Sequence, residues 1–438
     1  MRKIIQYMMM ALIAVVLASC ANDISEESTP TVKSNIRFVV DDFPMFEKPS
    51  TRTIGEEDKG KTAWAIGDEI CVKLESKKLG TQTATLKYNG VKFEIQDGNS
   101  LCYLEGEPVT AYAYYAPNRR WRNGSLDFKD IFGNPNGTAE FLEATCTVHY
   151  GDNNYVDISF ANATRNYSRL RIATIPKTEI KVDADVFSPT DNSNRLYMTY
   201  TLTSDEKGNA YLYGTFYNNS IVTVKYRGAT LKTYKFSKET ENAKSYALDA
   251  TVVSLTDEGI TRDQIVEDVK KELDAGKTYI NLILAPDVDE ETLEAIHIGL
   301  LEGDARDGSI NLTLIGCKKI PSRGFMYWKM LKSIALPDVT EIEENAFSDC
   351  SGLQKVVLGN LTKVYGKGRE NGIFDGCETR FIDLVLSKDQ KVMNDGEAEG
   401  RYCWTADIIT DYDLSNEHVS KKFLGYEFKS ITCRYKFE

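Results

Sequence analysis

The chain has 438 residues, of which 42% are hydrophobic, so it is long enough to form two to four domains with substantial cores. Its formal net charge of −12 argues against binding of nucleic acid, which requires a basic face, and against adhesion to anionic lipid by charge. Its nine cysteines contain no CxxC pair, so neither a zinc ribbon nor a redox motif is indicated.

The N-terminus has the organisation of a bacterial signal peptide. Arg2 and Lys3 are basic, and residues 8–17 form an apolar run of 10 residues. A membrane-spanning helix needs roughly 20 apolar residues, so this run is too short for a permanent anchor but has the length of a signal-peptide core. The run ends in Leu17-Ala18-Ser19-Cys20, which resembles the lipobox of bacterial lipoproteins.

The lipobox resemblance implies that residues 1–19 are removed and that Cys20 carries the acyl chains of a Gram-negative lipoprotein. Several acyl chains anchor a protein stably, where one is marginal. Cleavage would leave 419 residues (438 − 19) and a net charge of −14, because two basic residues are lost (−12 − 2). The alternative is an ordinary signal peptide in which the cysteine is incidental.

Residues 20–33 are predicted to be a flexible, polar tether. The acidic side chains Asp23, Glu26 and Glu27 follow the cysteine and resemble the surface-export signal of fimbrillin-bearing anaerobes. This resemblance implies an outer-membrane protein displayed on the cell surface, and periplasmic retention remains the alternative.

From residue 34 to about residue 250 the sequence has the pattern of short β-strands. Apolar residues alternate with polar ones around Ile36–Val40, Ile70–Leu74 and Asn194–Thr203, and turn-forming pairs such as Asn123-Gly124 separate the runs. Period-2 alternation in short segments is typical of antiparallel β-sandwiches. We therefore predict a mainly β protein with several domains.

Several motifs in this region resemble the fimbrillin-like, or Mfa-like, family. They are Thr51-Arg52, the segment Trp64–Ile70, the segment Ala111–Pro117, and Phe160–Ala163 leading into Leu170–Ile172. The resemblance implies two successive transthyretin-like β-sandwiches, which we place at residues 34–165 and 166–252. The second sandwich looks short for the family.

The family resemblance also implies a route to polymerisation. In fimbrillins an arginine-specific protease removes the first strand, and the C-terminal strand of another subunit fills the groove. Ile36–Val40 is a candidate first strand, and Arg52 is the candidate processing site. Cleavage would remove 33 residues, Cys20 to Arg52, and would bare unpaired backbone and apolar surface.

The pattern changes at residue 253. Thr261 and Gln264 have capping-box spacing and precede a helical stripe that runs from Ile265 to Leu273. A strand is predicted at Tyr279–Leu284, and a second helix at Asp287–Leu301.

A repeat of 22 residues follows these helices. Leu314, Leu336 and Leu358 are evenly spaced, as are the positions of Ile320, Ile342 and Val364, and an insertion at residues 366–372 stretches the next step to 27. Leucines at fixed offsets with this period indicate leucine-rich repeats. The pattern Leu331-Lys-Ser-Ile-Ala-Leu-Pro resembles the BspA-like repeat of bacterial surface proteins. Residues 253–438 are thus predicted to be a small leucine-rich repeat solenoid with a helical N-cap and, from Gly400, a β C-cap.

We find no pattern of catalytic, cofactor-binding or metal-binding residues. The histidines His149, His297 and His418 are scattered, and HExxH, GxSxG, Walker A and dinucleotide motifs are absent from the sequence. We therefore expect no enzyme, no cofactor and no metal. Cys71, Cys102, Cys350 and Cys377 read as small buried hydrophobes, whereas a Cys403–Cys433 disulfide stays open.

Aromatic residues of the repeat domain are the candidate ligand contacts. Tyr327 and Trp328 fall in a repeat turn, and Tyr402 and Trp404 near the C-cap. Aromatic side chains are enriched in binding hot spots and sugar-stacking surfaces, but packing in the core or cap is the alternative for each.

The sequence predicts a lipid-anchored surface adhesion protein that binds an extracellular protein or glycan through its repeats. If Arg52 is cut, it could join other fimbrillin subunits as a non-polymerising, tip-like component, because its C-terminus forms the cap of a repeat domain and not a free donor strand. If Arg52 is only a solvated loop residue, the protein is a solitary lipid-anchored one. The alternatives are a structural fimbrial subunit and a glycan-capturing outer-membrane lipoprotein. The sequence does not identify the ligand.

Overall fold

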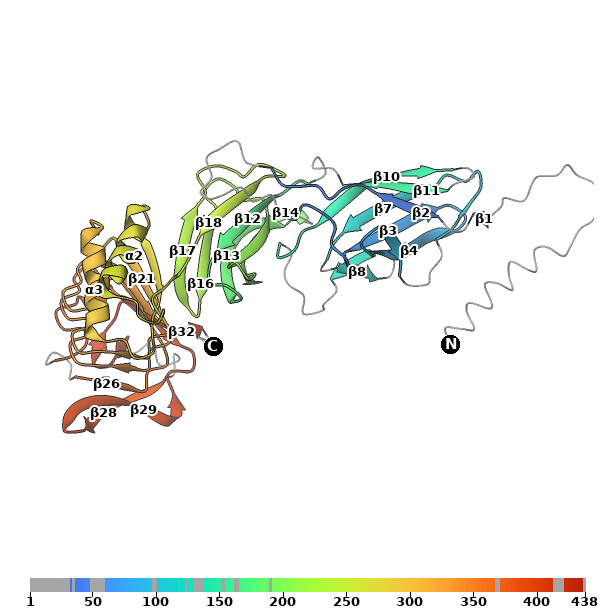
Figure 1. The fold of residues 1–438 in the computed structure, drawn as a ribbon. Helices are drawn as coiled ribbons and strands as arrows, with labels where there is room; N and C mark the ends of the chain where they lie inside the picture. The colour runs from blue at the N-terminus through green and yellow to red at the C-terminus, as the bar shows by residue number, and fades with distance from the viewer. Residues whose placement is uncertain are drawn as a thin grey trace, which may run out of the picture.

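The computed structural model describes residues 32–33, 36–47, 60–96, 101–117, 119–122, 125–128, 137–150, 154–160, 165–188, 191–366, 371–412 and 421–435. The described chain is mainly β and forms three bodies in a row, with the first β-domain at one end and the repeat domain at the other (Figure 1). Cys20 and Arg52 lie outside the described residues. Within the described part, we find no helix with the length and apolar character needed to cross a membrane.

The first domain is a curled sheet of seven strands in the order β2-β11-β10-β7-β3-β4-β5. Its strands are β2 (Arg37–Val40), β3 (Glu69–Ser76), β4 (Gly80–Tyr88), β5 (Phe93–Ile95), β7 (Thr110–Tyr115), β10 (Leu142–His149) and β11 (Tyr155–Ser159). Strand β10 turns the corner, because Leu142–Ala144 pair with β7 and Thr145–His149 pair with β11. The edge strands β2 and β5 therefore come together around one apolar core.

Two short strand pairs complete the first domain. They are β1 (Val32–Lys33) with β6 (Tyr103–Leu104), and β8 (Arg119–Arg122) with β9 (Ser125–Phe128).

The second domain is a sandwich of two sheets, ordered β15-β12-β18 and β14-β13-β16-β17. Its strands are β12 (Ser168–Ala173), β13 (Glu179–Ser188), β14 (Asp191–Thr203), β15 (Asn209–Gly214), β16 (Ile221–Tyr226), β17 (Ala229–Lys235) and β18 (Ser245–Asp249). Alternate residues of each strand enter a shared core, so that Tyr200 and Leu202 of β14 are buried as their alternation predicts.

The prediction of purely antiparallel sheets is wrong at two places. β2 pairs in parallel with β11, and β12 pairs in parallel with β18. Long stretches of chain separate the members of each pair, as parallel neighbours require. Alternation reveals which face of a strand is buried but not the direction of its neighbour, so the sequence could not show this.

The third domain begins with the predicted helical cap. Helix α2 (Arg262–Asp274) starts at Thr261, whose side chain and that of Gln264 form the predicted capping box. Strand β20 (Tyr279–Ile283) and helix α3 (Glu290–Glu302), capped by Asp289, also lie where the sequence predicts them. Helix α2 packs on α3 and β20, and the apolar faces of both helices lie in the core.

The repeats stack two parallel ladders of strands. A seven-stranded sheet contains β19 (Val253–Ser254), β20, β21 (Ile310–Ile315), β23 (Leu331–Leu336), β25 (Lys355–Leu358), β27 (Asp383–Ser387) and β32 (Ser430–Tyr435). Opposite it lie β22 (Lys319–Ile320), β24 (Glu341–Ile342) and β26 (Lys363–Tyr365), continued by the hairpin β28 (Lys391–Ala398) and β29 (Arg401–Asp411). The C-cap also carries the small hairpin β30 (Lys422–Phe423) and β31 (Tyr426–Glu427). The leucine columns fill the space between the ladders, with Leu314, Leu336 and Leu358 fully buried.

The second sandwich covers part of the outer face of the seven-stranded repeat sheet. β17 lies against β20, β21 and β23. Ala229 of β17 packs in a buried apolar cluster with Ala335, Val357 and Val385, which occupy one outward position in three successive repeats. Arg227 forms an ion pair with the buried carboxylate of Asp338 at the same junction.

A strap formed by residues 36–47 joins the two sandwiches. Its N-terminal part is β2 in the first domain, and its last residue, Glu47, forms a parallel bridge to Lys244 in the second domain. Phe43 lies between these two ends of the strap. Its ring packs edge to face on Trp64 and Tyr115, with ring centroids 4.8 and 5.3 Å apart. The strap therefore contributes to both domains, although in the sequence it belongs to the beginning of the first.

Candidate functional site

The four predicted aromatic contacts do not share one environment. Tyr327 is 57% exposed, whereas Trp328 is only 3% exposed and stacks on the His297 ring at 4.6 Å. Trp328 therefore packs in the core, which is the alternative that the sequence left open beside a ligand contact. Its neighbour Tyr327 has a positive φ of 68°, and this turn conformation directs the next side chain to the interior.

Tyr402 and Trp404 both lie on β29 in the C-cap. The Tyr402 hydroxyl donates to Asp395 on β28 at 3.2 Å, and the Trp404 ring is half-buried against the repeat core. The two rings contact each other edge to face at 6.2 Å. These contacts give both residues a packing role in the cap, and no finding tests a ligand contact.

The broad sheet face of the repeats is partly covered by the second sandwich. Ala229 and the rest of β17 cover its first rungs, and Asn281 on the same face donates to the Leu231 carbonyl at 3.1 Å. The covered part of this face is therefore not available to a ligand, whereas the opposite ladder is not covered by β17.

A first hollow, which we call the α3 hollow, lies between helix α3 and the turns of the repeats and has a volume of about 600 Å³. Helix α3 contributes Glu290, Glu294 and His297. The repeat turns contribute Ser322, Arg323, Gly324, Met326, Trp328, Glu344, Asn345 and Asn371. Burial lowers the pKa of His297, so its ring is neutral near pH 7. Most of the side chains that line the hollow are polar and can form hydrogen bonds.

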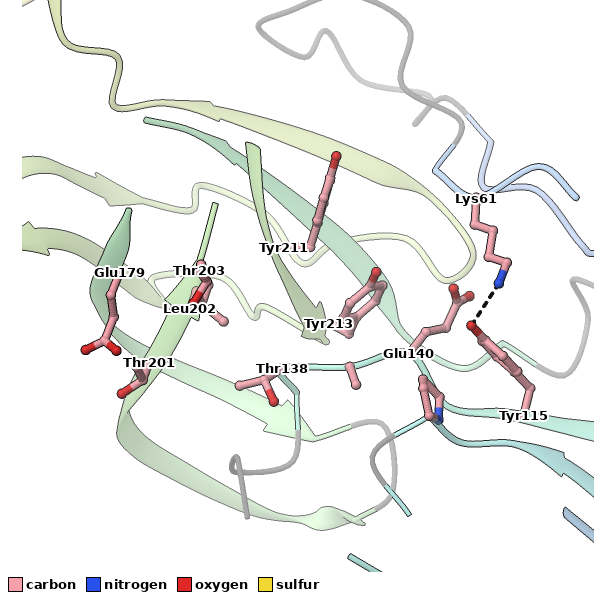
Figure 2. Close-up of a pocket in the computed structure, with 12 residues that line it drawn as sticks. Lys61, Tyr115, Thr138, Glu140, Glu179, Thr201, Leu202, Thr203, Tyr211 and Tyr213 are labelled. Atoms are coloured by element: carbon pink, nitrogen blue, oxygen red, sulfur yellow. Dashed lines mark hydrogen bonds between the residues drawn. The ribbon is translucent and has the colours of Figure 1, made fainter. Parts of the chain in front are cut away.

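A second hollow, the inter-sandwich pocket, has a volume of about 520 Å³ and lies between the first two domains (Figure 2). Tyr211 and Tyr213 come from β15, Tyr115 from β7, and Glu140 from the segment before β10. Lys61 donates a hydrogen bond of 3.1 Å to the Tyr115 hydroxyl and forms an ion pair with Asp68. The other lining residues are Pro117, Thr138, Ala139, Glu179, Thr201, Leu202 and Thr203.

The carboxylate of Glu140 in the inter-sandwich pocket is already paired within the protein. Glu140 forms an ion pair with Arg165, whose side chain is fully buried. Burial raises the pKa of Glu140 and that of the Tyr115 phenol. Tyr115 therefore keeps its proton at neutral pH and acts as a hydrogen-bonding group, not as a base.

Sequence reasoning did not identify either hollow as a site. The Tyr115 motif and the alternating tyrosines Tyr211 and Tyr213 of β15 are visible as patterns, but their meeting depends on how two domains pack. For the α3 hollow, the sequence predicts that the glutamates of α3 lie on a helix. Only the fold shows that they lie opposite Arg323.

The described residues contain no cluster of three or more His, Cys, Asp or Glu side chains that could hold a metal ion. No disulfide links the eight described cysteines, so the open question of a Cys403–Cys433 disulfide is resolved in favour of two separate buried thiols. Cys71 and Cys350 are buried as predicted, whereas Cys102 and Cys377 are only partly buried.

Comparison with known proteins identifies the repeat region. Residues 310–393 match the family described as BspA type leucine rich repeat region (6 copies). Among curated proteins, none shows significant sequence similarity to the chain.

Three solved structures that the chain partly resembles are an adhesion protein, a fimbrial anchor and a pilin. A candidate cell adhesion protein from Bacteroides fragilis is 11% identical, with a TM-score of 0.26, over 51% of this chain and 94% of its own. The fimbrial anchor protein Mfa2 from Porphyromonas gingivalis is 9% identical, with a TM-score of 0.21, over 45% of this chain and 81% of its own. The shaft pilin SpaA from Lactobacillus rhamnosus GG is 11% identical, with a TM-score of 0.19, over 50% of this chain and 97% of its own.

The repeat family covers only a section of the chain, residues 310–393. The family match, together with the motifs of the first two domains, makes the chain similar to a fimbrillin-like protein that ends in a domain of BspA type leucine-rich repeats.

Proposed function

We propose that the chain is a lipid-anchored cell-surface adhesion protein and not an enzyme. In this proposal Cys20 holds the protein at the outer membrane, the two β-domains form a stalk, and the repeat domain binds an extracellular protein or glycan. The order of the three bodies in Figure 1 supports it, because the second sandwich lies between the first domain and the repeat domain. The hydrogen-bonding character of the α3 hollow also suits binding better than catalysis.

The observation that carries a tip-like role is the position of β32. This strand pairs in parallel with β27 inside the repeat sheet, and its residues Ile431 and Cys433 are buried in the repeat core. Withdrawing β32 to donate it to another subunit would open that core. A subunit with this arrangement accepts a strand once its own first strand is removed but donates none, so it can only end a fibre.

The processing step is tested by treating the purified protein with an arginine-specific protease. We expect a cut at Arg52, loss of the strap with β2, and no long homopolymer in light scattering or electron microscopy. An Arg52→Gln variant is the matched control and should stay uncut at this position. Growth of long filaments from the cleaved protein alone would contradict the tip-like role and favour a structural subunit.

The anchor is tested separately through Cys20. A Cys20→Ser variant should lose metabolic labelling with palmitate and leave the membrane fraction, because the acyl chains supply the membrane affinity. Cys71→Ser is the control, since Cys71 is buried in the first domain and offers no acylation site. Undiminished labelling of Cys20→Ser would show that the anchor lies elsewhere.

A further inference from the structure

The turns of the repeats use a left-handed backbone conformation at two equivalent columns. In one column Tyr327 (φ 68°), Asp349 (φ 59°) and Gly376 (φ 71°) occupy matching positions in successive repeats. In the other, Arg323 (φ 60°) corresponds to Asn345 (φ 56°). Glycine, asparagine and aspartate tolerate this conformation, whereas long or bulky side chains are strained in it. The first repeat therefore carries two strained side chains where later repeats carry tolerant ones.

The fold does not account for these two side chains. Arg323 is exposed and Tyr327 is 57% exposed, so neither fills the core. Among the described residues, we find no hydrogen bond, ion pair or ring contact made by the side chain of either. Strain that no internal contact requires is a mark of function when it lies beside a concavity. Arg323 lines the α3 hollow, and so do Met326 and Trp328 on both sides of Tyr327.

We propose that this corner of the first repeat, Arg323 and Tyr327 beside the α3 hollow, is a carbohydrate-binding site. The inference rests on the proposed function and names the ligand class of the adhesion surface. A sugar ring stacks its C–H face on an exposed tyrosine, and its hydroxyls pair with carboxylates, amides and a guanidinium. The hollow supplies these partners as Glu290, Glu344 and Asn345 together with Arg323.

A carbohydrate fits the site better than a protein surface does. The volume of about 600 Å³ is that of a small-ligand cleft, and polar groups line it from both α3 and the repeat turns. Protein interfaces instead need a desolvated apolar centre. The guanidinium of Arg323 also offers a partner for the carboxylate of an acidic sugar.

The test is binding of the full-length mature protein to an array of neutral, N-acetylated, sialylated and sulfated oligosaccharides, followed by titration calorimetry with the best soluble glycan. Tyr327→Asn should reduce the affinity by at least about tenfold, because it removes the stacking ring. The same substitution should raise the melting temperature by about 2–4 °C, because asparagine relieves the backbone strain. Arg323→Asn should also raise the melting temperature, and it should weaken glycan binding.

Phe381→Ser is the matched control, because Phe381 in the short helix η2 (Thr379–Phe381) is 65% exposed, yet neither strained nor near the α3 hollow. It should leave glycan binding and the melting temperature unchanged. The inference is overturned if the wild-type protein binds no glycan, or if Tyr327→Asn binds as tightly as the wild type. If Cys20 is labelled with palmitate and Arg52 is cut as proposed, but the protein binds no glycan, the carbohydrate site is wrong while the anchor and the processing step stand.

Discussion

At the scale of single residues, the junction of the two sandwiches depends on the buried pair Glu140–Arg165. The Arg165 side chain is fully buried, donates to the Pro44 carbonyl at 3.0 Å, and lies 3.8 Å from the centre of the Phe46 ring. Removing one member of such a pair leaves an uncompensated charge inside the protein. Arg165 and Glu140 are 25 residues apart, so no local pattern in the sequence predicts that they meet.

We expect Arg165→Met to lower the free energy of unfolding by about 3–5 kcal/mol in urea denaturation. The double variant Arg165→Met/Glu140→Leu should regain most of this loss, because neither charge then remains buried. Lys92→Met is the control, since Lys92 and its partner Glu94 are both largely exposed, and it should change stability little. A double variant as unstable as Arg165→Met would contradict this account.

The same carboxyl predicts a pH dependence. Burial raises the pKa of Glu140 above the ordinary value of about 4.3 that it has in the unfolded chain. Below that pH both states are protonated, and as the pH rises the unfolded chain ionises first, so the stability contributed by this group falls until the folded pKa is passed. Loss of Arg165 raises the folded pKa further. The deficit of Arg165→Met should therefore be larger at pH 8 than at pH 4.5, and Glu140→Gln in that background should abolish the difference.

At the scale of elements, much of the repeat domain was predictable, because its period, its capping box and its buried leucine columns are local patterns. The parallel pairing of β2 with β11 and the covering of Trp328 were not, since they depend on distant strands and on a turn conformation. Close approach of successive rungs is another such feature. A Cβ added to Gly359 would lie 2.5 Å from the Val339 carbonyl oxygen and 2.7 Å from that of Pro337.

Gly359→Ala should therefore force two rungs apart and destabilise the repeat domain by about 1–3 kcal/mol. Gly396→Ala is the matched control, because nothing lies within 4 Å of a Cβ at that position in β28. Chemical denaturation followed by circular dichroism measures both. Equal stability of the two variants would show that the rungs adjust without cost.

At the scale of the whole molecule, the second sandwich and the repeats share a buried junction. The sequence carried one sign of it: Ala335, Val357 and Val385 place small apolar residues at one outward position in three repeats. Such a column indicates a covered face, but the sequence could not identify β17 as the cover. Ala229 is fully buried at this junction.

We expect Ala229→Asp to separate the second sandwich from the repeats, because it places a carboxylate in the apolar cluster. Limited proteolysis should then cut between residues 249 and 262 much faster than in the wild type. Thr233→Asp, at a partly buried position of the same strand that lies outside the cluster, is the control and should be cut at nearly the wild-type rate. Wild-type resistance of Ala229→Asp would mean that the junction does not hold the two domains together.

The strap of residues 36–47 has a mechanical consequence for a protein held at its N-terminus and loaded through its repeats. The strap runs from the first sheet towards the second sandwich, ending where Glu47 meets Lys244. Tension that draws the N-terminus away from the repeat domain then acts lengthwise along β2. The hydrogen bonds between β2 and β11 are then loaded in shear, so that they share the force and do not break one after another. Cleavage at Arg52, if it occurs, would remove β2, the strand under tension. The covalent connection through β2 would then be replaced by the hydrogen bonds of the strand that fills its place.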